Sequence, residues 1–293
     1  MIMLCEEKFY DIYGRDESGL TFSPYRICPI GAHSDHNLGK ITGFAIDKGI
    51  HLVYRPKQNG VIEITSLQFP KRAQWHILEV GEKTGDWADY LRGATWALEK
   101  KHVLSVGLCG VIEGGLPIGG LSSSAAVILA FLSALCKVNG ISLSERELID
   151  TAFDAEKNYV GVNVGTLDQS CEVLGKKNHL LYLDCADNSF ELIPTNPAMK
   201  PYQIAIFFSG LEHSLLGSKY NMRVDELRSG IYAIRAFAGM EYGKFKETNA
   251  RDLPFEVYEQ YKSKLPVPWM RRCEHWFTDF KRVQAGAEAW RNG

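Results

Sequence analysis

The sequence predicts a mixed α+β fold in two domains, and three observations support this. From residue 20 to 80 the chain has apolar runs, broken by Pro, Asn and Gly, that are typical of strands. Helical spacing of apolar residues follows at 87–102 and again at 142–161. Three prolines within residues 194–201 then mark a break, where we place a boundary between domains 1–195 and 196–293.

The predicted elements follow in order along the chain. Strands are expected within 42–56, 60–69, 107–117, 179–185 and 203–209. Helices are expected at 87–102, where Trp87, Leu91, Ala94 and Leu98 share a face, from the serines at 122–124 onward, at 142–161, and over most of the chain after 209. Ser142 followed by Glu145 predicts a capping box at the start of the third of these helices.

Composition and charge narrow the class of protein. The formal net charge is -2, which argues against a nucleic-acid surface or a polybasic membrane patch. The longest apolar stretch, 125–138, is too short to span a bilayer, and the N-terminus lacks the basic region of a secretory signal. The 7 cysteines include no C-x-x-C pair, so we expect reduced thiols in a cytoplasmic protein without a structural zinc site.

The most specific stretch is GGLPIGGLSSSAAVILAFLSAL, residues 114–135. Its glycines let a backbone approach a ligand closely, and the helix that follows has serines in its first turn. Free N–H groups and the positive end of the helix dipole favour an anion such as a phosphate there, and a serine hydroxyl can add a ligand for Mg²⁺. The stretch lacks the lysine of a Walker A loop, and no glycine follows Ser122 as in a nucleophile elbow. A capped core helix after a glycine turn is the alternative.

Two further segments concentrate polar residues. RICPIGAHSDHN, residues 26–37, holds His33 and His36 around an aspartate, but two histidines in a proline-bounded loop without a further histidine cluster make a poor metal-hydrolase site. VGVNVGTLDQS, residues 160–170, presents Asp168 after a glycine-rich approach. A carboxylate placed there can accept the proton of a hydroxyl group, and a nearby arginine would keep it ionised. A helix N-cap or a simple turn residue is the alternative role for Asp168.

Taken together and in order, RICPIGAHSDHNLGK, LPIGGLSSSAA and GTLDQS resemble the sugar motif, the phosphate loop and the catalytic segment of the GHMP kinases. The galactokinase branch is the most similar, because GLEHSLLGSKYNMRVDE (210–226) resembles its segment with a substrate-contacting tyrosine. SPYRICPIGAHSDH and RRCEHWFTDFKRVQAGAEAW (271–290) further resemble galacturonokinases. The resemblance implies a two-layer α/β fold with mixed sheets: an N-terminal domain like ribosomal protein S5 domain 2 and an incomplete ferredoxin-like C-terminal domain.

The resemblance also implies a role for each matching residue. Asp168 would be the catalytic base for the anomeric hydroxyl, and Arg26 would stabilise both Asp168 and the transferring phosphoryl charge. Ser124 and Glu156 would lie on the magnesium side, although the sequence leaves open which serine is the ligand. The implied sugar-binding residues are Ala32, His33, Asp35, His36, Gly165 and Tyr220. The implied nucleotide-binding residues are Gly119, Gly120, Leu121, Ser122, Ser123, Ser124 and Ala125. ATP and Mg²⁺ are the implied cofactors, and a small sugar is the implied partner.

Ala32 determines the predicted substrate. Galactokinases carry a glutamate at this position, where it contacts the primary hydroxyl of the sugar. A glutamate ~4 Å from the C6 carboxylate of a uronic acid would repel it by roughly 4 kcal/mol at an effective dielectric near 20, or about a thousandfold in affinity. Alanine therefore predicts phosphorylation of galacturonate at C1, with galactose as the alternative substrate. Alternatively, Ala32 is only a change of side-chain size in a loop and does not affect the choice of sugar. His36, Lys40 and Arg223 are the candidate partners of the substrate carboxylate.

One motif of the resembled family has no counterpart here. GHMP kinases carry a glycine-rich loop near the C-terminus that closes over the phosphates, and nothing after residue 240 fits it. The sequence therefore predicts a truncated chain whose second domain lacks part of its sheet. A sugar- or nucleotide-binding protein without catalysis is the corresponding alternative function.

Overall fold

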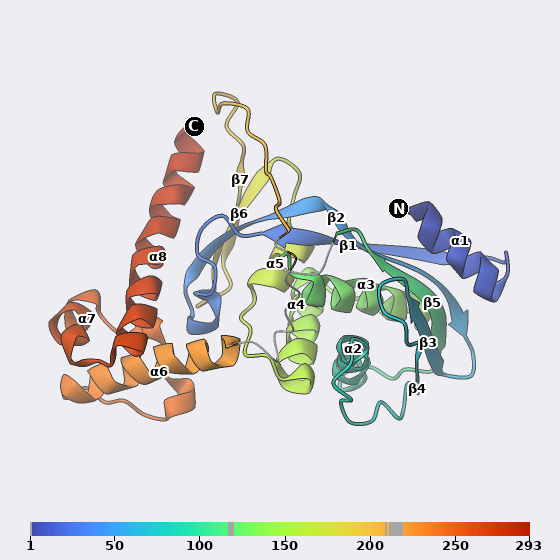
Figure 1. Cartoon of the computed structure of the whole chain (residues 1–293), viewed down its shortest axis with the longest axis horizontal. Coiled ribbons are helices and arrows are strands. Elements are labelled where there is room, and N and C mark those ends of the chain that lie inside the picture. The colour runs from blue at the N-terminus through green and yellow to red at the C-terminus, as the bar shows by residue number, and fades with distance from the viewer. Residues whose placement is uncertain (1, 117–119, 209, 211–218) are drawn as a thin grey trace.

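The computed structural model describes residues 2–116, 120–208, 210 and 219–293 (Figure 1). Its 7-stranded sheet has the order β4-β3-β5-β2-β6-β7, with β1 paired to β2 outside this path. The strands are β1 Gly19–Ile27, β2 Lys40–Lys57, β3 Val61–Ser66, β4 Ala73–His76, β5 Gly107–Gly114, β6 His179–Asp184 and β7 Phe190–Pro194. Since β3 and β5 are parallel and the other pairs are antiparallel, the predicted mixed α+β fold is confirmed.

The long strand β2 connects the two halves of the sheet. Its first residues, from Lys40 to Gly43, pair with β6, and its last residues, from Ile50 to Lys57, pair with β5. The strand β1 runs antiparallel along the other edge of β2 for most of its length. The strand β1 ends at Ile27, which pairs with Phe44 near the start of β2. The loop 28–39 that joins the two strands therefore lies at one end of the central pair.

Helices cover both faces of the sheet. The elements α2 Asp89–Glu99, α3 Ser123–Val138, α4 Glu145–Asp154 and α5 Leu167–Leu174 lie on one face, and α1 Ile2–Tyr13 lies on the other (Figure 1). Successive residues of a strand point to opposite faces. Leu52 accordingly belongs to the same core cluster as Phe131 of α3, whereas Val53 packs with Phe9 of α1.

The start of α4 corrects the predicted capping box. The N-cap is Ser144, whose hydroxyl accepts from the Glu147 backbone N–H while the Glu147 side chain accepts from the Ser144 N–H. The same spacing of Ser and Glu therefore occurs two residues later than Ser142 and Glu145, at the point where the helix begins. The helix α4 continues into a π-helical turn, Ala155–Val160, a feature that often marks functional sites.

Helices dominate the chain after residue 219, as predicted. The elements α6 Tyr220–Phe237, α7 Phe255–Tyr261 and α8 Val267–Asn292 share a hydrophobic cluster of their own. Trp276 of α8 also donates a hydrogen bond to the Ser34 carbonyl at 3.3 Å, which fastens these helices to the loop between β1 and β2. The domain boundary at 195 falls directly after β7 and stays a prediction.

The predicted strand at 203–209 is not formed within the described residues. Residues 203–208 have no regular secondary structure, and Phe207 is 90% exposed. A strand needs hydrogen-bonding neighbours, and no described strand pairs with this segment. Ser209 lies outside the described residues.

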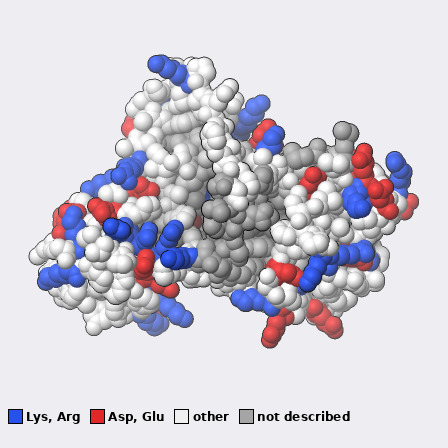
Figure 2. All heavy atoms as spheres, in the orientation of Figure 1, with Lys and Arg blue, Asp and Glu red and all other residues white. Residues whose placement is uncertain are grey.

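The surface carries charges of both signs, as a formal net charge of -2 leads us to expect. Figure 2 shows Lys and Arg interspersed with Asp and Glu on one face of the molecule. All seven cysteines, each within the described part of the chain, are free thiols. No described helix combines the length and apolar character needed to cross a membrane.

The central helix α3 gives a direct test of the core. Phe131 is completely buried, so Phe131→Ala should lower the free energy of unfolding by about 3–5 kcal/mol. Phe207→Ala, at the exposed segment, is the matched control and should change it by less than about 0.5 kcal/mol. Denaturant unfolding of both variants measures the difference, and equal losses would contradict the described core.

Candidate functional site

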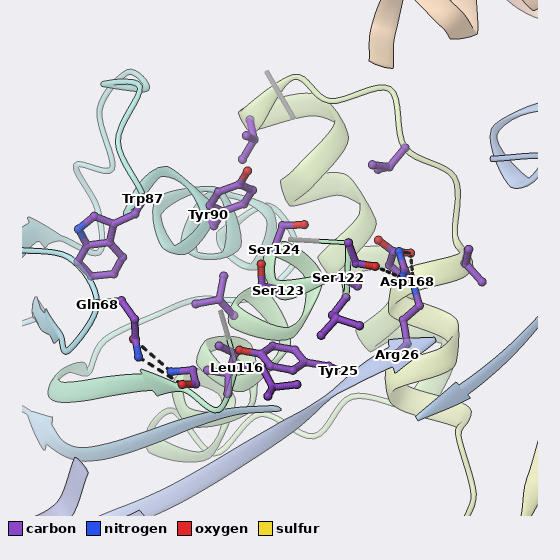
Figure 3. Close-up of a pocket in the computed structure, with 18 of the residues that line it drawn as sticks. Tyr25, Arg26, Gln68, Trp87, Tyr90, Leu116, Ser122, Ser123, Ser124 and Asp168 are labelled. Atoms are coloured by element: carbon purple, nitrogen blue, oxygen red, sulfur yellow. Dashed lines mark hydrogen bonds and ion pairs between the residues drawn. The ribbon is translucent and has the colours of Figure 1, made fainter. Parts of the chain in front are cut away.

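A cavity of about 650 Å³ opens where α3 and α5 begin, beside the loop that follows β1. It is lined on one side by residues of the sugar motif, on a second by the serines of α3, and on a third by aromatic residues before and within α2 (Figure 3). The lining from the predicted site comprises Arg26, Ala32, His33, Asp35, Gly120, Leu121, Ser122, Ser123, Ser124, Asp168 and Tyr220. The structure thus brings together segments that are far apart in the sequence.

An ion pair between Arg26 and Asp168 forms part of the cavity wall. The end of β1 places Arg26, and the first turn of α5 places Asp168. Both Nε and Nη2 of the guanidinium lie 2.7 Å from Asp168 Oδ1, and Nη1 donates to the Gly120 carbonyl at 3.0 Å. The arginine therefore ties the carboxylate to the glycine–serine loop, and Asp168 is neither an N-cap nor a turn residue.

The serines mark the start of α3. Ser122 is the N-cap residue and has a left-handed backbone with φ 66°, while Ser123 and Ser124 form the first helical turn. In Figure 3 their side chains lie between the Arg26–Asp168 pair and the aromatic residues of the opposite wall. The unpaired N–H groups of a helix start and its dipole suit a phosphate here. Ala125 is fully buried in the core and Gly119 lies outside the described residues.

Glu156, in the π-helical turn, is a buried acid facing the serines. Its Oε2 accepts from Gln169 Nε2 at 2.8 Å, but Oε1 is buried without a hydrogen-bond partner among the described residues. Burial, followed by the charge of Asp168, raises the pKa of Glu156 to about 8, while the nearby Ser124 hydroxyl lowers it.

A partnerless carboxylate oxygen beside a serine hydroxyl fits Mg²⁺, which in nucleotide sites takes one or two protein oxygens and completes its shell with phosphates and water. The described residues hold no group of three or more His, Cys, Asp or Glu that could hold a metal ion without such help. Ser124 and Glu156 are therefore suited to a metal that arrives with a phosphate.

Asp35 and Gly165 form the next part of the cavity wall. Asp35 is buried, its Oδ2 accepts from the Leu167 N–H at 3.2 Å, and its Oδ1 has no partner among the described residues. A methyl group on Gly165 would overlap the Asp35 carboxylate, which explains a glycine at that position. Burial, with the charge of Asp168 next, raises the pKa of Asp35 to about 6.

The aromatic group around Tyr220 closes the site on the α6 side. The Tyr220 ring lies edge-on to His33 at 5.3 Å and to His36 at 6.0 Å between ring centroids. Ala32 and His33 line the cavity, whereas His36 does not. Burial, followed by the charge of His33, lowers the pKa of His36 to about 3, so its ring is neutral beside the Asn37 amide.

The other two candidate carboxylate partners differ in their surroundings. Lys40 lies 3.4 Å from Asp184, which also binds Arg251, and it is absent from the cavity lining. Arg223 is exposed in the first turn of α6 and forms no ion pair with a described residue. Like Lys40, Arg223 is absent from the cavity lining, but it lies one helical turn after Tyr220, which lines the cavity. Burial and the charge of His275, followed by the charges of Arg26 and Arg223, lower the pKa of His33, whereas the charge of Asp168 raises it.

Sequence reasoning missed two parts of this site. Phe69 and Trp87 stack with centroids 5.7 Å apart and planes at 7°, and with Tyr90 they line the cavity. The sequence pattern places Trp87 on the core face of a helix, but α2 begins only at Asp89. The second part is Glu172, which lies one helical turn after Asp168 on α5. Two acids at i and i+4 of a helix repel each other, and this spacing is the one sequence feature that points to Glu172.

Comparison with known proteins agrees with this geometry. Residues 89–176 match the GHMP kinases N terminal domain, and residues 7–56 match the galactokinase galactose-binding signature. The chain is 33% identical over 311 residues to the galacturonokinase of Arabidopsis thaliana, covering 98% of this chain and 73% of that protein. It is 29% identical to the galactokinase of Chloroflexus aurantiacus over 96% of this chain and 70% of that protein. Among solved structures, Lactococcus lactis galactokinase complexed with galactose superposes with a TM-score of 0.83 at 26% identity, over 97% of this chain and 73% of that chain.

The fold and the matched sequences define a small-molecule kinase, and the chain belongs to the GHMP kinase family. Within that family the chain is similar to galactokinase-like proteins. These relatives are sugar kinases, which transfer a phosphoryl group to an alcohol.

The raised pKa of Asp35 predicts a pH-dependent cost in stability. Between pH 3.8 and about 6 the unfolded chain releases this proton while the folded chain keeps it, so rising pH favours unfolding. The difference corresponds to roughly 3 kcal/mol when complete. Asp35→Asn removes it, and the variant should become more stable than the parent protein as the pH rises from 4 to 7.

Thermal unfolding at several pH values measures this effect. Asp47→Asn, at an exposed position, is the control and should follow the parent at every pH. A constant offset between Asp35→Asn and the parent would show that the Asp35 carboxyl titrates normally in the folded protein.

Proposed function

We propose that this protein is an ATP- and Mg²⁺-dependent kinase that transfers a phosphoryl group to the anomeric hydroxyl of galacturonate, giving galacturonate 1-phosphate. The observation that carries the choice of sugar is Ala32, a small neutral residue in the wall of the cavity that contains the Arg26–Asp168 pair. Cytoplasmic location, predicted from the free thiols, belongs to this proposal.

Asp168 acts as the base. Its carboxylate accepts the proton of the C1 hydroxyl, the sugar oxygen forms a bond to the γ-phosphorus, and the bond from that phosphorus to the β–γ bridging oxygen breaks, so that ADP leaves. Arg26 balances the charge of Asp168 and of the phosphoryl group in transfer. Little covalent chemistry is needed from the protein, because positioning and electrostatic stabilisation lower the barrier.

The nucleotide extends from the serines to the aromatic wall. The N–H groups and hydroxyls of Ser122, Ser123 and Ser124 face the phosphates, and the stacked Phe69–Trp87 pair offers the flat apolar surface that a base requires. Ser124 and Glu156 would hold Mg²⁺, which when bound offsets the negative charge of the phosphates.

The sugar occupies the part of the cavity between Asp168 and Tyr220. Asp35, whose Oδ1 has no partner among the described residues, can accept hydrogen bonds from the ring hydroxyls of the sugar, and His33 also lines this part of the cavity. Ala32 leaves room for a C6 carboxylate without a second negative charge beside it.

Arg223 is the proposed partner of that carboxylate. Of the three sequence candidates, Lys40 is paired with Asp184 and His36 is neutral at physiological pH. Arg223 forms no ion pair with a described residue and lies one helical turn after Tyr220, which lines the cavity. An arginine can also bind a carboxylate through two parallel hydrogen bonds.

The substrate test compares two sugars. The parent protein should release ADP with galacturonate far faster than with galactose in a coupled assay. Ala32→Glu should reduce kcat/KM for galacturonate about a thousandfold, through repulsion of the carboxylate, without a comparable loss for galactose. Ala32→Gln has the same size without the charge and separates repulsion from crowding.

Galactose is the second candidate substrate, because residues 7–56 match a galactose-binding signature. Equal or greater turnover of galactose by the parent would favour it and overturn the uronate proposal. Asp168→Asn controls for contaminating kinases, since it should lose activity with both sugars. Binding of either sugar without any turnover would favour a binding protein.

Removal of the Arg223 charge should affect one sugar selectively. Arg223→Gln should raise KM for galacturonate about tenfold by removing a charged hydrogen bond, and should leave KM for galactose nearly unchanged. Arg146→Gln, on the exposed surface of α4, is the matched control for a lost surface charge. An equal change with both sugars would rule out Arg223 as the carboxylate partner.

A further inference from the structure

Glu172 is a buried acid that the proposed mechanism leaves without a role. It lies on α5, four residues after Asp168, and is only 6% exposed. Both of its carboxyl oxygens are buried without a hydrogen-bond partner among the described residues. A carboxyl group buried in this way costs free energy, so its retention calls for a compensating contact.

The neighbours of Glu172 belong to the phosphate loop and the catalytic pair. Burial, followed by the charge of Asp168, raises its pKa well above the usual range, whereas the Ser122 hydroxyl beside it and Arg26 lower it. A carboxyl group that is buried with neither oxygen hydrogen-bonded to a described residue favours its protonated form, which carries a proton that it can donate.

Ser122 also has a polar group without a hydrogen-bond partner among the described residues. Its hydroxyl oxygen is buried and has no hydrogen-bond partner among the described residues, although the residue lines the cavity. Its backbone has φ 66°, a conformation that a residue with a side chain seldom adopts and that marks a locally constrained position. Two polar groups without a hydrogen-bond partner among the described residues thus lie on contacting helices, Ser122 in the cavity wall at the start of α3 and Glu172 on α5 outside the lining.

The direction of the Ser122 proton follows from the state of Glu172. A hydroxyl has one proton to donate and lone pairs that accept. An ionised Glu172 would accept that proton and turn the lone pairs of Ser122 toward an anionic phosphate, which is repulsive. A neutral Glu172 instead donates to the Ser122 oxygen and leaves the hydroxyl proton for the ligand.

We propose that Glu172 is a positioning residue: its carboxyl donates a hydrogen bond to Ser122 Oγ, so that the Ser122 hydroxyl donates in turn to a phosphate oxygen of the bound nucleotide. This inference rests on the proposed nucleotide site at the start of α3. It assigns a role in phosphate binding to a residue that touches neither the sugar nor the phosphate.

Two variants of nearly equal volume test the donor role. Glu172→Gln keeps an N–H donor, so its affinity for MgATP should stay within about threefold of the parent. Glu172→Met has no donor, and its affinity should fall about tenfold, as for a lost hydrogen bond to a charged group. Isothermal titration of the full chain with MgATP measures both, and thermal unfolding confirms that each variant is folded.

A double-mutant cycle with Ser122→Ala shows whether the two residues act together. Ser122→Ala should weaken MgATP binding about as much as Glu172→Met, and the double variant should be no weaker than either one. Losses that multiply, a Gln variant as weak as the Met variant, or a Met variant with unchanged affinity would each overturn the inference. If Glu172→Met prevents folding, Glu172→Leu, which also lacks a donor, replaces it in the cycle with Ser122→Ala.

The same titration separates this inference from the function on which it rests. Unchanged MgATP affinity in Ser122→Ala, or no MgATP binding by the parent, would contradict the nucleotide site itself. Weaker binding in Ser122→Ala with full affinity in Glu172→Met would retain the nucleotide site and reject the role of Glu172.

Discussion

The ion pair between Arg26 and Asp168 is the interaction on which the rest of the site depends. It joins the end of β1 to the first turn of α5, and the same guanidinium binds the Gly120 carbonyl ahead of α3. A single side chain thereby fixes the relative positions of the end of β1, the glycine–serine loop and the start of α5. Because both partners are mostly shielded from solvent, loss of either one would leave a charge without compensation inside the cavity.

The same pair lies in an unusual concentration of acids. Asp35, Glu156 and Glu172 surround Asp168, and burial raises the pKa of all three. Such a cluster opposes folding of the unliganded protein, because these groups would be better solvated in the unfolded chain. Ligands that bring cations or hydroxyl groups would compensate these buried acids. The protein therefore has lower stability without ligand at the place where the ligand binds.

The sequence predicted the fold class and the parts of the site that depend on local pattern. Strands 42–56 and 60–69, the helix from the serines and the helical C-terminal region follow from periodicity and turn residues, and the structure has them. The residues of segment 203–209 favour a strand, but strand formation depends on neighbours that a local pattern does not reveal.

Long-range contacts explain why the other features of the site could not be predicted from the sequence. Ordered motifs indicated that Arg26 and Asp168 share a site, yet only the folded chain shows that Lys40 is bound by Asp184 and that His36 is half-buried outside the cavity lining. Trp87 and Phe69 come from separate loops, and their stacking depends on tertiary packing. The role of Glu172 was hidden for the same reason, since burial of one charged residue among many cannot be seen in composition.

The exposed segment after β7 has a practical consequence for work with this chain. Residues 203–208, QIAIFF, combine high strand propensity with no charge and no proline, and their backbone has no described strand beside it. Such a stretch can template cross-strand association between molecules. Concentrated preparations should therefore self-associate through this segment, and a lysine in place of Phe207 would act as a gatekeeper that keeps the chain dispersed.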